Sequence, residues 1–170
     1  MDFTAEVERA LRVCDGAVCV FDGMQGVETQ SETVWMQANK FNIPRLGFIN
    51  KLDRAGAQIE TTLESVKRRL KVEPLLLNVP VDDSNQLQGL IDLPSMMLYE
   101  YNDDMGQYVD IQELGEDHQY FERATSYLEK LIEQLSNYDD ELADQYLSGI
   151  EPWQVDKQLI DRAIKFSLSE

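Results

Sequence analysis

The sequence has very few of the residues that perform nucleophilic catalysis or bind zinc. It contains two cysteines and one histidine in 170 residues. Cys14 and Cys19 are too few for a disulfide framework, and their spacing matches no zinc pattern. His118 is the only histidine and no Gly-x-Ser-x-Gly motif is present, so serine and cysteine triads have no support. We expect two reduced, mostly buried thiols and a surface histidine.

The chain also lacks long apolar runs and an excess of positive charge. No run of about 18 apolar residues occurs, so we expect no helix that spans a membrane. The first six residues match neither a signal peptide nor a presequence. There are 15 basic side chains against 32 acidic ones, which gives a formal net charge of -17. Phosphates would repel such a chain, so it cannot grip nucleic acid over its whole surface, and its charged partners should be basic.

Charge divides the chain into two parts. Residues 1–74 carry 10 basic and 11 acidic side chains, whereas residues 75–170 carry 5 and 21. An asymmetry this steep predicts two modules with different surfaces. The 43% of hydrophobic residues is enough to build a core, so the chain should be folded.

The first module alternates predicted helices and strands. Its short, continuous apolar runs are typical of strands that are buried on both faces. The predicted helices cover residues 2–13, 28–42 and 57–71, and the predicted strands cover residues 17–21 and 46–49. This alternation predicts an α/β fold, in which helices cover both faces of a parallel sheet.

The second module has strands first and helices afterwards. The predicted strands cover residues 75–79, 87–93, 96–101 and 107–109. A long helix should follow His118 and run to about Leu147, either unbroken or interrupted near residues 137–139. A last helix should cover residues 154–166. This order predicts an α+β subdomain with a small antiparallel sheet.

The most informative motif is Asn50-Lys51-Leu52-Asp53, which directly follows a predicted strand. Open α/β sheets bind ligands at the carboxyl ends of their strands. A carboxylate at Asp53 can accept hydrogen bonds from the ring N–H and the exocyclic amine of guanine, whereas adenine lacks both donors in that arrangement. Asn50, Lys51 and Asp53 therefore predict a guanine site; the alternative is a surface loop in which Lys51 and Asp53 are merely solvated.

No phosphate-binding loop of the form Gly-x-x-x-x-Gly-Lys-Ser/Thr accompanies this motif. Catalysis of GTP hydrolysis depends on positioning and charge neutralisation at the phosphates. We therefore expect this chain alone not to hydrolyse GTP, and either it is a fragment or its nucleotide site is vestigial.

Seven segments of the chain share one pattern: residues 2–13, 15–18, 26–35, 42–45, 48–54, 89–93 and 128–133. Together they closely resemble the elongation factor G family of translational GTPases. The resemblance implies a P-loop-NTPase-type sheet that is incomplete in this chain, which would begin just after switch II. It assigns residues 1–74 to a partial G domain, 75–165 to the G-prime insertion and 166–170 to the return. Only Asn50, Lys51 and Asp53 are implied as GTP or GDP contacts, with no catalytic residue and with the Mg²⁺ ligands outside the chain.

A second set of segments resembles one branch of that family. Residues 20–23, 26–28 and 73–77 are similar to the second mitochondrial form, which splits ribosomes together with the ribosome recycling factor. This resemblance implies a role in ribosome recycling in the mitochondrial matrix. The alternatives are an elongation-factor-G-type translocase, a cytoplasmic location, a sibling with the same insertion, and a non-catalytic binding module.

Acidic residues recur along the long predicted helix of the second module. Their spacings of 7, 4, 7 and 4 predict one exposed stripe, made of Glu122, Glu129, Glu133, Asp140 and Asp144. Such a stripe is either a solvated face or a docking surface for a basic protein. The family resemblance implies the large-subunit stalk protein of the ribosome as that partner.

Overall fold

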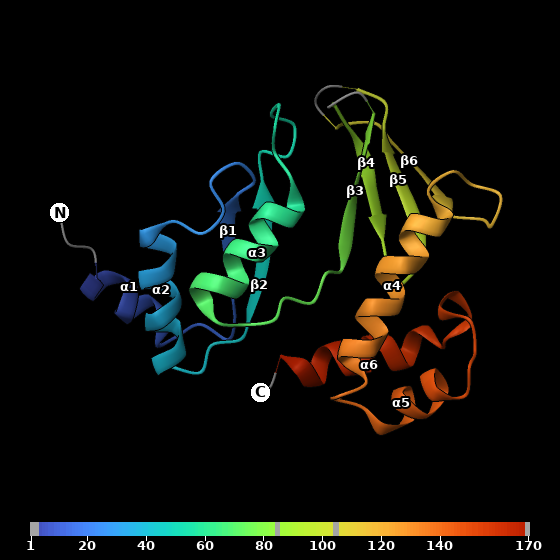
Figure 1. Ribbon diagram of the computed structural model, residues 1–170. Coiled ribbons are helices and arrows are strands. Elements are labelled where there is room, and N and C mark those ends of the chain that lie inside the picture. Colours follow the sequence, from blue (N-terminus) through green and yellow to red (C-terminus); the bar gives the residue numbers. More distant parts are fainter. Residues whose placement is uncertain (1–3, 84–85, 104–105, 169–170) are drawn as a thin grey trace. The chain divides into compact units, whose positions relative to one another are not determined.

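The computed structural model describes residues 4–83, 86–103 and 106–168. The chain divides into two compact units, Met1–Pro74 and Leu75–Glu170 (Figure 1). None of the helices in the described ranges is long and apolar enough to cross a membrane.

The first unit alternates helices and strands, as predicted. Its elements are α1 (Thr4–Leu11), β1 (Ala17–Asp22), α2 (Thr29–Lys40), β2 (Arg45–Asn50) and α3 (Ile59–Leu70). β1 and β2 pair in parallel, in a register that runs from Ala17 opposite Arg45 to Asp22 opposite Asn50. The prediction of a parallel α/β arrangement is confirmed for these two strands.

Apolar side chains from all three helices of the first unit pack beside β1. One buried cluster joins β1 and its following loop to α2 and α3, and it consists of Phe21, Val27, Trp35, Val66 and Leu70. A second cluster joins α1 to α2 through Leu11, Ala38 and Ile43. These clusters fix the helices on the face of the sheet that carries Phe21.

The other face of this two-stranded sheet is open. Val18, Val20, Leu46 and Phe48 are between 48% and 65% exposed. The expectation that both strands are buried on both faces is therefore wrong for the described residues. The physical reason is that an apolar run shows only that a strand favours burial. It does not show whether another element of the chain covers the second face of the sheet.

The second unit is an antiparallel sheet followed by helices, which confirms the α+β prediction. The strands are β3 (Asn78–Asp83), β4 (Gln86–Asp92), β5 (Met97–Tyr101) and β6 (Val109–Glu113), in the spatial order β3-β4-β5-β6. The helices are α4 (Phe121–Leu135), α5 (Asp140–Leu147), the 3₁₀ helix η1 (Pro152–Gln154) and α6 (Lys157–Ser167). The return segment expected to begin at residue 166 starts inside α6.

Two strands of this sheet begin later than predicted. β3 begins at Asn78 rather than at Leu75, and it continues through Pro80. A proline is tolerated there because β3 lies at the edge of the sheet, where one side of the strand needs no ladder donor. β6 begins at Val109, which had been expected to end a strand. The segment between β5 and β6 falls partly outside the described residues.

Close backbone contact joins the two central strands. Gly89 of β4 lies opposite Glu100 of β5, and a Cβ at position 89 would lie 2.1 Å from the carbonyl oxygen of Tyr99. Only glycine fits this position, because no real Cβ approaches a backbone oxygen so closely.

The core of the second unit draws on the sheet and on three helices. Its fully buried residues include Val79, Ile91 and Leu98 from the strands, and Leu128, Leu131, Ile132, Leu135, Leu142 and Ile160 from α4, α5 and α6. The residues of α4 recur at spacings of three and four, so this helix contributes one apolar stripe.

The long helix predicted in this unit is broken where the sequence left that possibility open. α4 ends at Leu135, and Asp139 caps a new helix by accepting hydrogen bonds from the backbone N–H groups of Glu141 and Leu142, each at 3.1 Å. A side-chain cap satisfies N–H groups that have no partner within the helix, so it favours a fresh helix start at this point.

Candidate guanine-binding site

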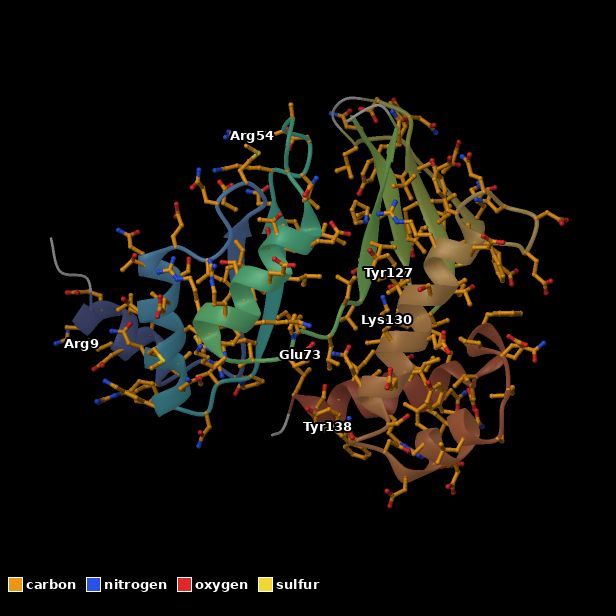
Figure 2. The ribbon with its side chains drawn as sticks, viewed as in Figure 1. Arg9, Arg54, Glu73, Tyr127, Lys130 and Tyr138 are labelled. Atoms are coloured by element: carbon orange, nitrogen blue, oxygen red, sulfur yellow. The ribbon has the colours of Figure 1, made fainter. Side chains whose placement is uncertain are left out.

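The Asn50–Asp53 motif lies at the carboxyl end of β2, beside the carboxyl end of β1. Asp22, the last residue of β1, is the register partner of Asn50. The motif continues into a loop whose tip carries Arg54 (Figure 2), and the N–H of Arg54 donates to the carbonyl of Lys51 at 3.2 Å. This is the sheet edge at which α/β folds bind ligands.

Asn50 joins the ends of the two strands. Its backbone carbonyl accepts a hydrogen bond from the N–H of Gly23 at 2.8 Å, and its side-chain Oδ1 accepts one from the N–H of Lys51 at 2.9 Å. A Cβ at Gly23 would lie 3.0 Å from the Asn50 carbonyl and 3.1 Å from Leu52, so this close approach favours glycine.

Lys51 has an unusual backbone conformation. Its φ of 64° lies in the left-handed region, which costs a residue with a Cβ about 1 kcal/mol or more. Its ammonium forms an ion pair with Oδ2 of Asp22, 29 residues earlier in the sequence. The Lys51 side chain is 39% exposed and that of Asp22 is 16% exposed. The fold thus fixes both ends of this long side chain.

Asp22 is held by the loop that follows β1 as well as by Lys51. Its Oδ1 accepts hydrogen bonds from the N–H groups of Met24 at 2.8 Å and Gln25 at 3.2 Å. The hydrogen bond from Lys51, assisted by that from Met24, lowers the pKa of Asp22 from 3.8 to about 2. The carboxylate is therefore ionised throughout the neutral range.

Sequence reasoning did not assign Asp22 to the site. The signal was present, because Asp22 ends a predicted strand and parallel strands bring their carboxyl ends together. What the sequence could not supply was the register that places Asp22 opposite Asn50. Asp53 and Asn50 are both exposed, so their side chains are accessible to a ligand.

The loop between Asp22 and α2 is packed tightly on α3. The N–H of Gly26 donates to the carbonyl of Asp22 at 2.7 Å, and the N–H of Val27 donates to Oγ of Ser65 at 3.0 Å. Gly26 has a φ of +68°, and a Cβ there would lie 2.7 Å from the side chain of Ser65. This packing anchors the residues that hold Asp22.

The five acidic residues predicted to form one stripe are divided between two helices. Glu122, Glu129 and Glu133 are on α4, whereas Asp140 and Asp144 are on α5. The expectation of a single helical line is wrong, because the cap at Asp139 starts α5 as a separate helix. The two groups are nevertheless parts of one packed assembly, since α4 contacts α5.

Two glutamates of α4 affect the pKa of a tyrosine on α5. Burial raises the pKa of Tyr146 on α5, and the carboxylates of Glu133 and Glu129 raise it further. Those two glutamates therefore act on the surface where α5 meets α4. On α4, the ammonium of Lys130 lies 5.6 Å from the centre of the Tyr127 ring (Figure 2).

The remaining reactive side chains form no second site in the described ranges. Cys14 is exposed, contrary to expectation, and Cys19 is half-buried. Burial raises the pKa of the Cys19 thiol, with Arg45 partly opposing it, so the thiolate is disfavoured. His118 is half-buried and its ring lies 5.3 Å from that of Tyr120. Within the described residues, no three acidic, histidine or cysteine side chains form a metal-binding group.

Comparison with known proteins shows the family to which the chain belongs. The family model described as the elongation factor Tu GTP binding domain matches residues 1–166. The chain therefore belongs to this family, the GTP-binding domains of translational GTPases. Among curated proteins it is similar to elongation factor G of Neorickettsia sennetsu (strain ATCC VR-367 / Miyayama), with 46% identity over 152 residues.

That similarity covers 89% of this chain and 22% of the relative, so the chain spans about a fifth of the length of that protein. Among solved structures, a crystal structure of a protein from Thermus thermophilus is similar with a TM-score of 0.79 and 24% identity, over 98% of this chain and 24% of that one. This second similarity supports the fold, and the predicted fold class is confirmed by it.

Proposed function

We propose that this chain provides the guanine-recognition edge and an acidic insertion of a GTP-hydrolysing translation factor of the elongation factor G type. The observation that carries the proposal is the placement of Asn50, Lys51 and Asp53 at the carboxyl end of β2, with Asn50 and Asp53 exposed and Lys51 held in place. GTP and GDP are the ligands that this edge would take.

The chemistry of the edge discriminates guanine from adenine. Two oxygens of Asp53 accept hydrogen bonds from the ring N–H and the exocyclic amine of guanine, while the stem of Lys51 lies along the base. Adenine would leave the desolvated carboxylate without hydrogen-bond donors. This loss would weaken binding by about 1–3 kcal/mol, or more because the group is charged.

The described part of this chain does not account for binding of the phosphates or of the magnesium ion. No phosphate-binding loop occurs in the 170 residues, and the described residues include no metal-binding cluster. Mg²⁺ would neutralise phosphate charge during hydrolysis. Hydrolysis is therefore proposed for the complete protein, and the chain alone is expected to show no turnover of GTP.

Replacing Asp53 tests the assignment of the base. In the complete protein, Asp53→Asn should shift preference from guanine toward xanthine nucleotides, because the amide donates where the carboxylate accepted and xanthine has a carbonyl in place of the amine. The measurement is competition of GDP and XDP against a fluorescent nucleotide. Asp15→Asn, an exposed aspartate elsewhere in the same unit, is the matched control. Unchanged preference for GDP would refute the assignment.

On the ribosome, we propose recycling as the role of the complete protein, with translocation as the competing role. The similarity of residues 20–23, 26–28 and 73–77 to the ribosome-splitting mitochondrial branch favours recycling, whereas the relative found at 46% identity is called elongation factor G. Subunit splitting with ribosome recycling factor, measured by light scattering beside translocation of peptidyl-tRNA, separates the two. Splitting without translocation supports recycling, and translocation supports the competitor.

The same branch resemblance favours the mitochondrial matrix as the location, with the cytoplasm as the alternative. Imaging of the complete protein fused to a fluorescent protein at its C-terminus decides between them. Mitochondrial signal supports the proposal, and a diffuse cytoplasmic signal contradicts it.

We also propose that the acidic residues of α4 and α5 dock a basic ribosomal protein, namely the stalk protein of the large subunit. The five residues are Glu122, Glu129, Glu133, Asp140 and Asp144, and all are exposed. Residues 75–170 carry nearly all of the excess negative charge. The negative electrostatic potential of this charge repels ribosomal RNA and accelerates the association of a basic protein domain.

A further inference from the structure

Asp22 and Lys51 form a link across the nucleotide edge that the Asn-Lys-x-Asp motif does not itself require. They come from neighbouring parallel strands, and their register places Asp22 opposite the residue that precedes Lys51. The ammonium of Lys51 reaches back from the end of β2 to Oδ2 of Asp22 at the end of β1. The lysine side chain therefore links the end of β2 to the end of β1, with 39% of its surface still exposed.

The fold fixes both ends of this side chain. At the backbone end, the N–H of Lys51 donates to Asn50 Oδ1 at 2.9 Å and the carbonyl of Lys51 accepts from Arg54 at 3.2 Å. At the ammonium end, Asp22 is itself held by the N–H groups of Met24 and Gln25. The rotatable bonds of the lysine side chain are thus restrained before any ligand arrives.

We propose that Asp22 is a positioning residue for guanine nucleotide, which holds the methylene stem of Lys51 as a preformed apolar support for one face of the base. This inference rests on the proposed function. Asp22 does not touch the nucleotide; it acts through Lys51. It also balances the lysine charge locally, so the uncharged base meets the stem rather than a free ammonium.

The size of the effect follows from the cost of ordering a flexible side chain on binding. That cost corresponds to about a threefold to tenfold loss of affinity for one long side chain. If Asp22 is removed, the complex must order Lys51 when the nucleotide binds. The recognition of guanine over xanthine should not change, because Asp53 carries it.

Nucleotide affinity of the complete protein tests the proposal. The probe is fluorescent GDP, followed at equilibrium and during dissociation. Asp22→Asn keeps an acceptor for Met24 and Gln25 but loses the attraction for Lys51, and it should raise Kd about threefold to tenfold, chiefly through faster dissociation. Asp22→Glu, which retains the carboxylate, should restore part of the affinity. Glu8→Gln breaks the Lys40–Glu8 pair of 3.1 Å in the same unit and is the matched control, with no expected change.

A double-mutant cycle separates positioning from general stabilisation. Lys51→Met keeps an unbranched apolar stem and removes the ammonium, so Asp22→Asn should cause no further loss in that background. Additive losses, or a normal Kd in Asp22→Asn, would overturn the inference. If Asp53→Asn switches the base preference while Asp22→Asn binds normally, the inference fails and the proposed function stands. Failure of the unmodified complete protein to bind GDP would overturn both.

Discussion

Arg162 of α6 donates to both carboxylate oxygens of Asp139, with distances of 2.6 Å from Nε to Oδ2 and 2.7 Å from Nη2 to Oδ1. The same aspartate caps α5 through the N–H groups of Glu141 and Leu142. The Asp139 side chain is 2% exposed, whereas that of Arg162 is 42% exposed. One buried carboxylate thus fixes the start of α5 and its contact with α6, through a bidentate pair of the stronger kind.

Removing the arginine should destabilise the second unit. Arg162→Met leaves Asp139 buried without its charged partner, and we expect a loss of about 2–3 kcal/mol in the free energy of unfolding. Lys157→Met, which removes an exposed positive charge from the same helix, is the control and should cost little. Urea unfolding followed by Trp153 fluorescence, in a Trp35→Phe background, reports this unit separately. Equal midpoints for the two variants would contradict the prediction.

Acid should weaken the second unit through the same carboxylate. The hydrogen bonds from Arg162 lower the pKa of Asp139 from 3.8 to about 2. Because the folded state binds this proton less readily than the unfolded state, the contribution to stability is complete above about pH 4 and is lost as the pH falls toward about 2. Asp139→Asn should reduce this acid sensitivity. The measurement is the urea midpoint of Trp153 fluorescence between about pH 6 and 2, again in the Trp35→Phe background. Parallel pH curves for the two proteins would refute the assignment.

Reversing charge on α4 should slow docking of a basic partner. Glu129→Lys with Glu133→Lys should lower the rate of association with the stalk protein several-fold at low salt, with a difference that shrinks as salt is raised. Glu116→Lys with Asp117→Lys makes the same charge change at exposed positions in the turn that precedes α4, outside the helix itself. Stopped-flow association at several ionic strengths compares the pairs. If both pairs slow association equally, the effect is one of net charge and no docking surface lies on α4.

The open face of β1 and β2 should make the 170-residue chain associate with itself. Val20 and Phe48 are register partners, and each is 56% exposed. Contiguous exposed apolar surface favours association, so Val20→Thr with Phe48→Thr should lower the apparent mass in sedimentation at high concentration. Leu147→Thr, at an exposed position in the second unit, is the control. A mass that does not depend on these substitutions would show that this face is inert.

Sequence patterns predicted the types of element well where one residue period dominates. The alternation of helix and strand in the first unit, its parallel pairing and the α+β order of the second unit are confirmed by the structure. The apolar runs at 18–20 and 46–48 did not reveal that one face of the sheet is exposed. A continuous apolar run indicates that both faces of a strand favour burial, but it does not show whether this chain supplies the layer that would bury the second face.

Relationships that depend on register or on capping were less accessible to the sequence. The pairing of Asp22 with Lys51 needs the alignment of two strands that are far apart in the chain. The acidic spacing from Glu122 to Asp144 fits one helix, but a single cap at Asp139 divides it. The left-handed conformation of Lys51 has no signal in residue type, since lysine rarely adopts it.

Gly89 sets a limit on inherited variation in this protein. A single-nucleotide change in a glycine codon that alters the amino acid always introduces a Cβ, and here even alanine would place that carbon 2.1 Å from the Tyr99 carbonyl oxygen. Codon 89 should therefore tolerate synonymous changes alone. Because the glycine lies on β4 in the second unit, a missense change at this codon should lower the amount of folded protein.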